Sequence, residues 1–212
     1  MVVVVPSAGQ TGKLSSCVTQ FNPHNKKRVH NMRVALRALD GLTIKPREIF
    51  SLNRRLGKRI QSRGYRTAVV FEEGKKVPGI GGGASQVTGT LFNAALMAGL
   101  PIREYHNHSR PVPYLPVGRD ATLAWDVKDL KLKNNTPAPI KLSYTIKGNR
   151  LIAALYGHQK PGKQVRISVV KRRLAKHHIV ARLYRVFKQN GIVVSKELVG
   201  TSAYKWEPES PD

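Results

Sequence analysis

Residues 79–99 read GIGGGASQVTGTLFNAALMAG, a glycine-rich loop followed by a run with helical periodicity. Apolar residues recur on one face of a 3.6-residue repeat, at Val87, Leu91, Ala95 and Ala98. Gly99 followed by Pro101 is a typical stop signal for a helix. The pattern therefore predicts a helix over residues 85–98 that begins at or beside Ser85.

The position of Ser85 at this predicted helix start suggests a reactive group. A helix N-terminus offers unpaired N–H groups and the positive end of the helix dipole. Glycines such as Gly82 and Gly83 let a ligand approach the backbone closely. Nucleophilic cysteines use this placement, although this chain has serine. The alternative is that Ser85 only caps the helix, which stabilises it by about 0.5–2 kcal/mol over alanine.

Two histidines follow the predicted helix. Residues 102–109 have a strand-like pattern, and a period of two places His106 and His108 on one face. A histidine can act as general base, and we favour His108, with Asp120 as the residue that orients it. Two alternatives remain open. The histidines could ligate a metal together with Asp120 or Glu104, or both could be structural.

Two arginines flank these residues. Arg110 and Arg119 could bind the carboxylate of a peptide, because the guanidinium fork matches that geometry. Asp120 could equally pair with one of these arginines.

The composition implies anionic partners. Lys and Arg total 37 against 12 Asp and Glu, which gives a formal net charge of +25. Nucleic acid is the usual partner of such a protein, but the basic residues are spread along the chain and no nucleic-acid-binding motif is present. Teichoic acids, anionic lipid headgroups and other wall polymers satisfy the same electrostatics. Cys17 is the only cysteine, which excludes an intramolecular disulfide, and we expect it to be a buried structural thiol.

The chain carries no evident targeting segment. Residues 1–6 are too short for a signal peptide and lack its basic start. No apolar run approaches the roughly 20 residues needed to span a bilayer. We therefore expect an export signal or anchor, if there is one, to be absent from this chain.

The pattern of elements predicts an α+β fold. Two main helices, over residues 25–39 and 85–98, are expected to pack on a mainly antiparallel sheet with a C-terminal β extension. We divide the chain into a flexible lead-in (1–13), a core domain (14–157), a β extension of the same domain (158–206) and a polar tail (207–212).

Several motifs together resemble one known family. Residues 81–87 and 90–94 look like the central motif of the VanW family, a bacterial cell-envelope domain in which the residue matching Ser85 is normally cysteine. The likeness spans roughly residues 15–205. Its further motifs follow in order, at residues 21–23, 30–31, 106–111, 118–122 and 134–136.

The resemblance implies a function in the cell wall. Some VanW-domain proteins are L,D-transpeptidases that cross-link peptidoglycan stem peptides through that cysteine. By this resemblance the chain is an extracytoplasmic acyl-transfer domain that needs no cofactor or metal and whose partners are stem peptides and anionic wall polymers, with nucleic acid disfavoured. The catalytic candidates are Ser85, His108, Asp120 and His106. The candidates for substrate contact are Gly82, Gly83, Gln86, Arg110 and Arg119.

Two alternatives to this function remain. In the first, Ser85 has lost the chemistry and the chain is a basic wall-binding module. In the second, less favoured, a metal-dependent peptidase uses His106 and His108.

Overall fold

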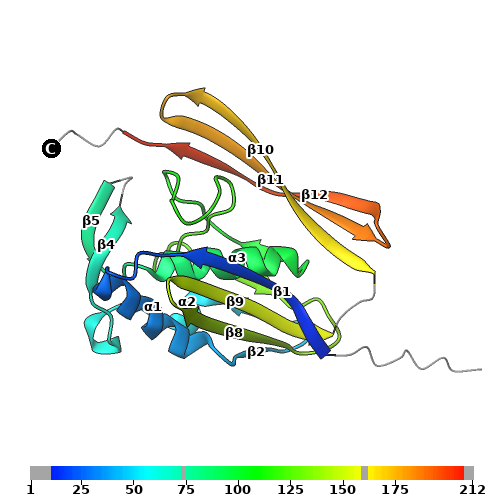
Figure 1. Ribbon diagram of the computed structural model, residues 1–212, viewed down its shortest axis with the longest axis horizontal. Coiled ribbons are helices and arrows are strands. Elements are labelled where there is room, and N and C mark those ends of the chain that lie inside the picture. Colours follow the sequence, from blue (N-terminus) through cyan, green and yellow to red (C-terminus); the bar gives the residue numbers. More distant parts are fainter. Residues whose placement is uncertain (1–10, 73–74, 159–161, 208–212) are drawn as a thin grey trace, which may run out of the picture.

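The structure, a computed structural model, describes residues 11–72, 75–158 and 162–207 (Figure 1). Its helices are α1 (Lys26–Leu39), α2 (Leu52–Leu56), α3 (Ala84–Met97) and a 3-10 turn (Gln61–Arg63). Its first strands are β1 (Thr11–Gln20), β2 (Thr43–Ile44), β3 (Ile49–Ser51), β4 (Thr67–Glu72), β5 (Lys75–Ile80) and β6 (Ile102–Glu104). The later strands are β7 (Lys131–Lys133), β8 (Ile140–Lys147), β9 (Arg150–His158), β10 (Lys163–Ala175), β11 (His178–Gln189) and β12 (Ile192–Lys205).

The strands form antiparallel sheets, which confirms the predicted α+β class. The largest sheet has the order β1-β9-β8-β2, and a smaller one has the order β3-β7-β6. Strands β4 and β5 form a hairpin. The C-terminal strands make a separate sheet, β10-β11-β12, and its β11-β12 turn has positive φ at Asn190 and Gly191. These two φ values suit a tight hairpin turn, as the Asn-Gly pair predicts.

Helix α1 confirms the first predicted helix. The Asn25 side chain accepts a hydrogen bond from the Arg28 amide, at 3.2 Å, and so caps the helix start. The helix ends at Leu39, and Gly41 follows with a φ of 79°. Its apolar side packs on α3 and on β8. The fully buried Met32 and Leu39 belong to that side.

Helix α3 confirms the second predicted helix, but it is buried far beyond one face. In Figure 1 it lies between the β1-β9-β8-β2 sheet and the C-terminal sheet, and it contacts β1, β9 and β10. Only Ser85 and Met97 of its 14 residues are not buried. A helix that is covered on all sides needs apolar side chains, or polar side chains whose hydrogen bonds are made within the protein.

The polar side chains of α3 are satisfied inside the protein. Thr90 is hydrogen-bonded to Thr19 of β1 at 2.8 Å and donates to the Gln86 carbonyl at 2.7 Å. The Asn93 amide donates to the carbonyls of Gly89 and Arg119, both at 2.7 Å. Burial of an amide or hydroxyl without a partner costs about 1–3 kcal/mol, so these bonds fix the rotation of α3 about its axis.

Two predictions made from the sequence are wrong in detail. The strand expected over residues 102–109 ends at Glu104, because its partner β7 is only three residues long and offers no further ladder. His106 and His108 therefore lie in an irregular segment and not on one face of a strand. Residues 11–13 of the expected lead-in belong to β1, where Thr11 pairs with His158. Residues 1–10 lie outside the described residues.

Removal of the Phe92 ring should destabilise the fold strongly. Phe92 is fully buried on α3 and stacks on Tyr105, with the ring centroids 4.6 Å apart. We expect Phe92→Ala to lower the free energy of unfolding by about 3–5 kcal/mol, through lost burial and the cavity left behind. Urea denaturation followed by circular dichroism measures this change. Val127→Ala, at a side chain 71% exposed, is the control and should change it by less than about 0.5 kcal/mol. A similar loss of unfolding free energy in both variants would contradict the inference that the packing of α3 stabilises the fold.

Candidate active site

The glycine loop is built so tightly that it tolerates no side chain. A Cβ on Gly82 would lie 2.4 Å from the Val69 carbonyl oxygen, and Gly83 has a φ of 111°. The buried Asn31 of α1 fixes the loop from behind: its amide donates to the carbonyls of Arg66 and Gly82 at 2.8 and 3.0 Å. The loop therefore enters α3 in one defined direction.

Ser85 lies in the first turn of α3 and is half-buried. Its hydroxyl is hydrogen-bonded to the Thr122 hydroxyl at 3.2 Å. The amides of Gln86 and Val87 both donate to the Gly83 carbonyl. Within the described part of the chain, the Ser85 amide has no such acceptor. An N–H group in this position can stabilise an oxyanion formed at the residue that carries it.

His108 and Asp120 form a buried pair. One Asp120 carboxylate oxygen accepts from the His108 amide and from the ring nitrogen Nδ1, each at 2.8 Å. Their side chains are 3% and 1% exposed. The ring also meets the Phe71 ring edge-on, with 5.9 Å between centroids. With Nδ1 bound to the carboxylate, the neutral imidazole presents Nε2 as its proton acceptor.

Tyr204 of β12 holds the other side of Asp120. Its hydroxyl donates to the second carboxylate oxygen and accepts from the Gly118 amide at 2.7 Å. Burial and the negative charge of Asp120 raise the pKa of Tyr204 well above its usual range. The phenol therefore stays protonated at neutral pH and remains a hydrogen-bond donor to the carboxylate.

One cavity of about 330 Å³ brings the helix start and the histidine together. Ser85, His108, Gly82 and Gly83 all line it, and Asp120 lies directly behind His108. Apart from His108, the titratable residues that line the cavity are basic or phenolic. These residues are Arg28, Lys58, Arg59, Lys128 and Tyr114, and no Asp or Glu that the structure describes lines the cavity with them.

Arg28 is an anchored cation of this cavity. Its guanidinium donates to the Gln86 side chain at 2.7 Å and lies over the Tyr114 ring, 5.7 Å from its centroid. Burial lowers the pKa of the guanidinium, but arginine stays charged in proteins. Gln86 itself is buried and donates to Thr19 and Gln20, so its side chain orients Arg28 and does not line the cavity.

The remaining residues expected at the site lie elsewhere. His106 is hydrogen-bonded to Glu104 at 3.0 Å and is absent from the cavity wall. Arg110 lies over the Phe71 ring, 5.9 Å from its centroid. Arg119 donates to the Asn93 side chain at 2.7 Å, which turns it toward α3. The structure therefore does not place either arginine on the wall of this cavity.

The two histidines have separate carboxylate partners. His106 pairs with Glu104, whereas His108 pairs with Asp120. Across residues 11–72, 75–158 and 162–207, no group of three His, Cys, Asp or Glu side chains could hold a metal ion. The donor set required by the peptidase alternative is not assembled in these residues.

Sequence reasoning missed four residues of the site. Arg28 comes from α1, Tyr204 from β12, and Thr122 and Trp125 from the segment between β6 and β7. Only the fold brings these residues to the cavity or to Asp120. Thr122 lies in one of the motifs that resemble the VanW family, and this was the single signal that pointed to any of them. Its amide donates to the His106 carbonyl at 2.8 Å, which fixes it beside Ser85.

Fold and site together define a basic α+β domain in which a helix N-terminus and a His-Asp pair face one cavity. The family model described as VanW like protein matches residues 27–156, more than half of the 212 residues. The chain therefore belongs to the VanW family.

Two curated proteins are similar to this chain. Uncharacterized protein YoaR of Bacillus subtilis is 40% identical over 146 residues, which cover 69% of this chain and 48% of the relative. Vancomycin B-type resistance protein VanW of Enterococcus faecalis is 28% identical over 143 residues, which cover 65% of this chain and 52% of the relative. The chain thus spans about half the length of these relatives. No solved structure matches it. Among the described residues, no helix is both long and apolar enough to cross a membrane.

The buried tyrosines should make the fold sensitive to alkali. Burial raises the pKa of five tyrosines, which are Tyr65, Tyr105, Tyr114, Tyr144 and Tyr204. A raised pKa stabilises the fold below the unfolded value of about 10, and this stabilisation is lost as pH rises through the folded value. We expect tyrosinate absorbance at 295 nm to appear together with loss of circular dichroism above about pH 10.

The contribution of Tyr204 can be separated by its phenylalanine variant. We expect Tyr204→Phe to reduce the fall of stability with pH by up to about 1.4 kcal/mol per pH unit, since one fewer group is released. Complete tyrosine ionisation in a protein that stays folded would show that these phenols are not held as the structure has them.

Proposed function

We propose that the cavity is an acyl-transfer site for peptidoglycan stem peptides, of the type found in VanW-domain L,D-transpeptidases. The observation that carries the proposal is the common cavity wall of Ser85 and His108, with Asp120 bonded behind the histidine. A nucleophile, a base and an orienting carboxylate are the parts that acyl transfer requires.

The proposed reaction follows from these positions. The side chain at position 85 attacks the carbonyl of the donor peptide, and Nε2 of His108 takes its proton. The peptide C–N bond breaks, the proton passes to the leaving amine, and the terminal D-alanine departs. The amine of an acceptor peptide then attacks the acyl group and gives a proton to Nε2 of His108. The bond between the acyl group and the side chain at position 85 breaks, and that side chain regains its proton from His108. The amide of residue 85 stabilises the oxyanion in both steps.

The cavity walls suit a substrate with carboxylates. Arg28, Lys58 and Arg59 line the cavity together with Lys128, and among the described residues no acidic side chain lines it beside them. Arg59 is anchored to the Asn53 side chain at 2.7 Å, so its charge has a fixed position. Stem peptides end in a carboxylate, which such an arrangement attracts and orients. These cations take the place that the sequence analysis gave to Arg110 and Arg119.

Serine is a weak nucleophile in this setting. A helix N-terminus can bring a thiol, with a reference pKa near ~8.5, into the thiolate range, whereas a hydroxyl depends wholly on its base. In this structure the Ser85 hydroxyl is bonded to Thr122. The proposed site is therefore built for a cysteine at position 85, and serine should leave it poorly active or inactive.

Ser85→Cys should confer acyl transfer on the protein. We expect new cross-links between stem peptides, and released D-alanine, when the variant is incubated with peptidoglycan fragments and analysed by mass spectrometry. His108→Ala in the same background should reduce the rate by at least about 10²-fold, since general-base catalysis contributes that much. His106→Ala is the matched control and should retain the activity, because His106 lies outside the cavity wall. A folded Ser85→Cys protein that yields no product, and whose thiol alkylates no faster than free cysteine, would refute the catalytic proposal.

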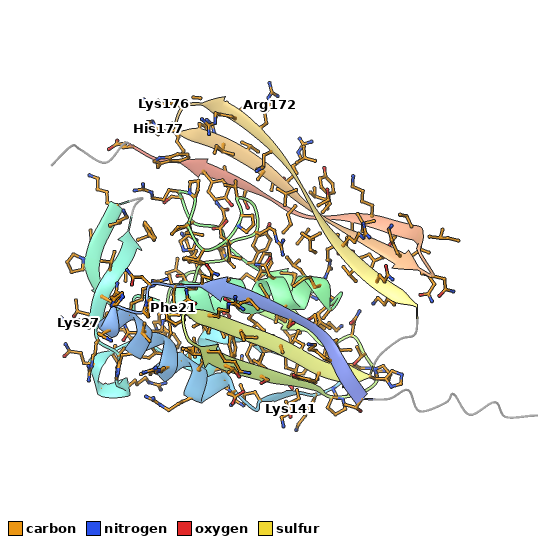
Figure 2. The ribbon with its side chains drawn as sticks, viewed as in Figure 1. Phe21, Lys27, Lys141, Arg172, Lys176 and His177 are labelled. Carbon is orange, nitrogen blue, oxygen red and sulfur yellow. The ribbon has the colours of Figure 1, made fainter. Side chains whose placement is uncertain are left out.

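The second candidate is a wall-binding module without catalysis. The observation that favours it is the hydrogen bond of Ser85 to Thr122, which keeps the hydroxyl occupied. The charge of +25 supplies an affinity for anionic wall polymers in either case. Figure 2 shows the labelled basic residues Lys27, Lys141 and Arg172 on α1, β8 and β10, in well-separated parts of the molecule. Basic residues spread in this way favour a polyanion that contacts many parts of the surface over a ligand that is recognised by one basic groove.

Binding to wall polymer should depend steeply on salt. The Debye length shrinks from about 10 Å at 0.1 M to about 3 Å at 1 M, so contacts between exposed charges are largely screened at the higher concentration. We expect purified cell walls to retain the protein at 0.1 M salt and to release most of it at 1 M. Equal retention at both concentrations would contradict the electrostatic account. Tighter binding to duplex DNA than to wall polymer at matched salt would favour nucleic acid as the partner.

A further inference from the structure

A second cavity adjoins the proposed catalytic cavity. It has a volume of about 340 Å³ and shares two wall residues, Trp125 and Lys128, with its neighbour. The two cavities are therefore neighbours that have Trp125 and Lys128 in common. Ser51, Asn53 and Asp126 contribute polar groups to the second cavity only.

Trp125 is presented on a rigid turn. Ala124 and Lys128 close the turn, with the Ala124 amide donating to the Lys128 carbonyl at 3.0 Å. The Asn53 side-chain amide donates to the carbonyls of both residues at 2.9 Å and so fixes the turn to α2. Trp125 nevertheless remains 43% exposed. A large aromatic ring that is exposed but held in position is a ready surface for a ligand to stack on.

The charges of the second cavity are balanced, unlike those of the first. Its wall has three bases, Arg54, Lys128 and Lys131, and three acids, Glu104, Asp126 and Asp129. The chain has only 12 acidic residues among 212, so three of them at one cavity of a strongly basic protein is a marked local concentration. A balanced wall of this kind gives no electrostatic preference for an anion. It favours a neutral ligand with many hydroxyl or amide groups.

The acids of this cavity are not equivalent. Glu104 is paired with Lys131 at 2.7 Å, and Asp129 accepts from the Ser51 hydroxyl at 2.6 Å. The exposed Asp126 carboxylate has no hydrogen-bond or ion-pair partner within residues 11–72, 75–158 and 162–207. Asp126 has a φ of 61°, a backbone conformation that Asp and Asn adopt more readily than most residues. Its carboxylate beside the indole can accept hydrogen bonds from a ligand that stacks on Trp125.

We propose that the second cavity binds a pyranose ring of the glycan strand that carries the stem peptide. The C–H face of a sugar packs on an indole ring, and its hydroxyl groups donate to carboxylates such as Asp126. The sugars of this glycan are joined to the peptide through an amide and are neutral, which fits a wall with balanced charge. The inference rests on the proposed function for the identity of the ligand. It assigns the peptide to the cationic cavity and the sugar to its neighbour, with Trp125 between them.

The test compares two ligands on the protein with Ser85 in place, so that binding is measured without turnover. One ligand is the free stem tetrapeptide, and the other is the same tetrapeptide attached to its disaccharide. We expect isothermal titration calorimetry to give the disaccharide ligand a dissociation constant about tenfold lower. Trp125→Ala and Asp126→Asn should each reduce this ratio, the first to near one. Asp126→Asn should leave the affinity for the free tetrapeptide unchanged, because Asp126 lines the second cavity alone.

Trp206→Ala is the matched tryptophan control. Trp206 packs edge-on against His177, with 5.4 Å between ring centroids, and lines neither cavity. Its removal should leave the ratio unchanged. Equal affinity for the two ligands in the unaltered protein, or an equal loss for both ligands in Trp125→Ala, would overturn the inference.

The two proposals can fail separately. A sugar-dependent ratio that requires Trp125, in a protein whose Ser85→Cys variant is inactive, would support the glycan site and reject the catalytic one. An active Ser85→Cys variant with no preference for the disaccharide ligand would support the catalytic proposal and reject the glycan site.

Discussion

The burial of α3 on almost every side is the constraint on which the rest of the structure depends. Because sheets cover the helix on both sides, each of its polar side chains has to find a partner in a neighbouring element. Thr90 finds Thr19 on β1, and Asn93 finds Arg119 in the segment that also carries Asp120. These bonds set the rotation of the helix. They thereby determine that its N-terminus, and Ser85 in particular, opens into the cavity and not into the core.

The sequence predicted the parts of the fold that local rules determine. The two main helices follow from periodicity and from start and stop signals, to within one residue at each end. The failures concern segments whose structure is set by distant partners. His106 and His108 separate because β7 is too short to continue a strand past Glu104. No local pattern contains that information, since β7 is more than twenty residues away in the chain.

The distribution of charge is a further feature that the composition predicts only in part. A net charge of +25 predicts anionic partners but does not say where they bind. In the described part of the fold, four bases and no acid line the cavity beside Ser85, whereas three of each line the cavity beyond Trp125. Two neighbouring cavities whose walls differ in charge can each bind a different part of one ligand. The sequence could not predict this, because Arg28 and Lys128 reach the first cavity from segments one hundred residues apart.

Asp120 connects the family region to the C-terminal sheet. The family model ends at residue 156, yet the buried Asp120 carboxylate takes one of its hydrogen bonds from Tyr204 of β12. A buried carboxylate is stable only when donors satisfy it, so loss of Tyr204 would leave one oxygen without that donor and loosen the support of His108. The same phenol accepts from Gly118 and so fixes the segment that leads to Asp120 and Thr122. The orientation of the proposed base therefore depends on a strand outside the family region, and the C-terminal sheet is part of the structure that holds the site.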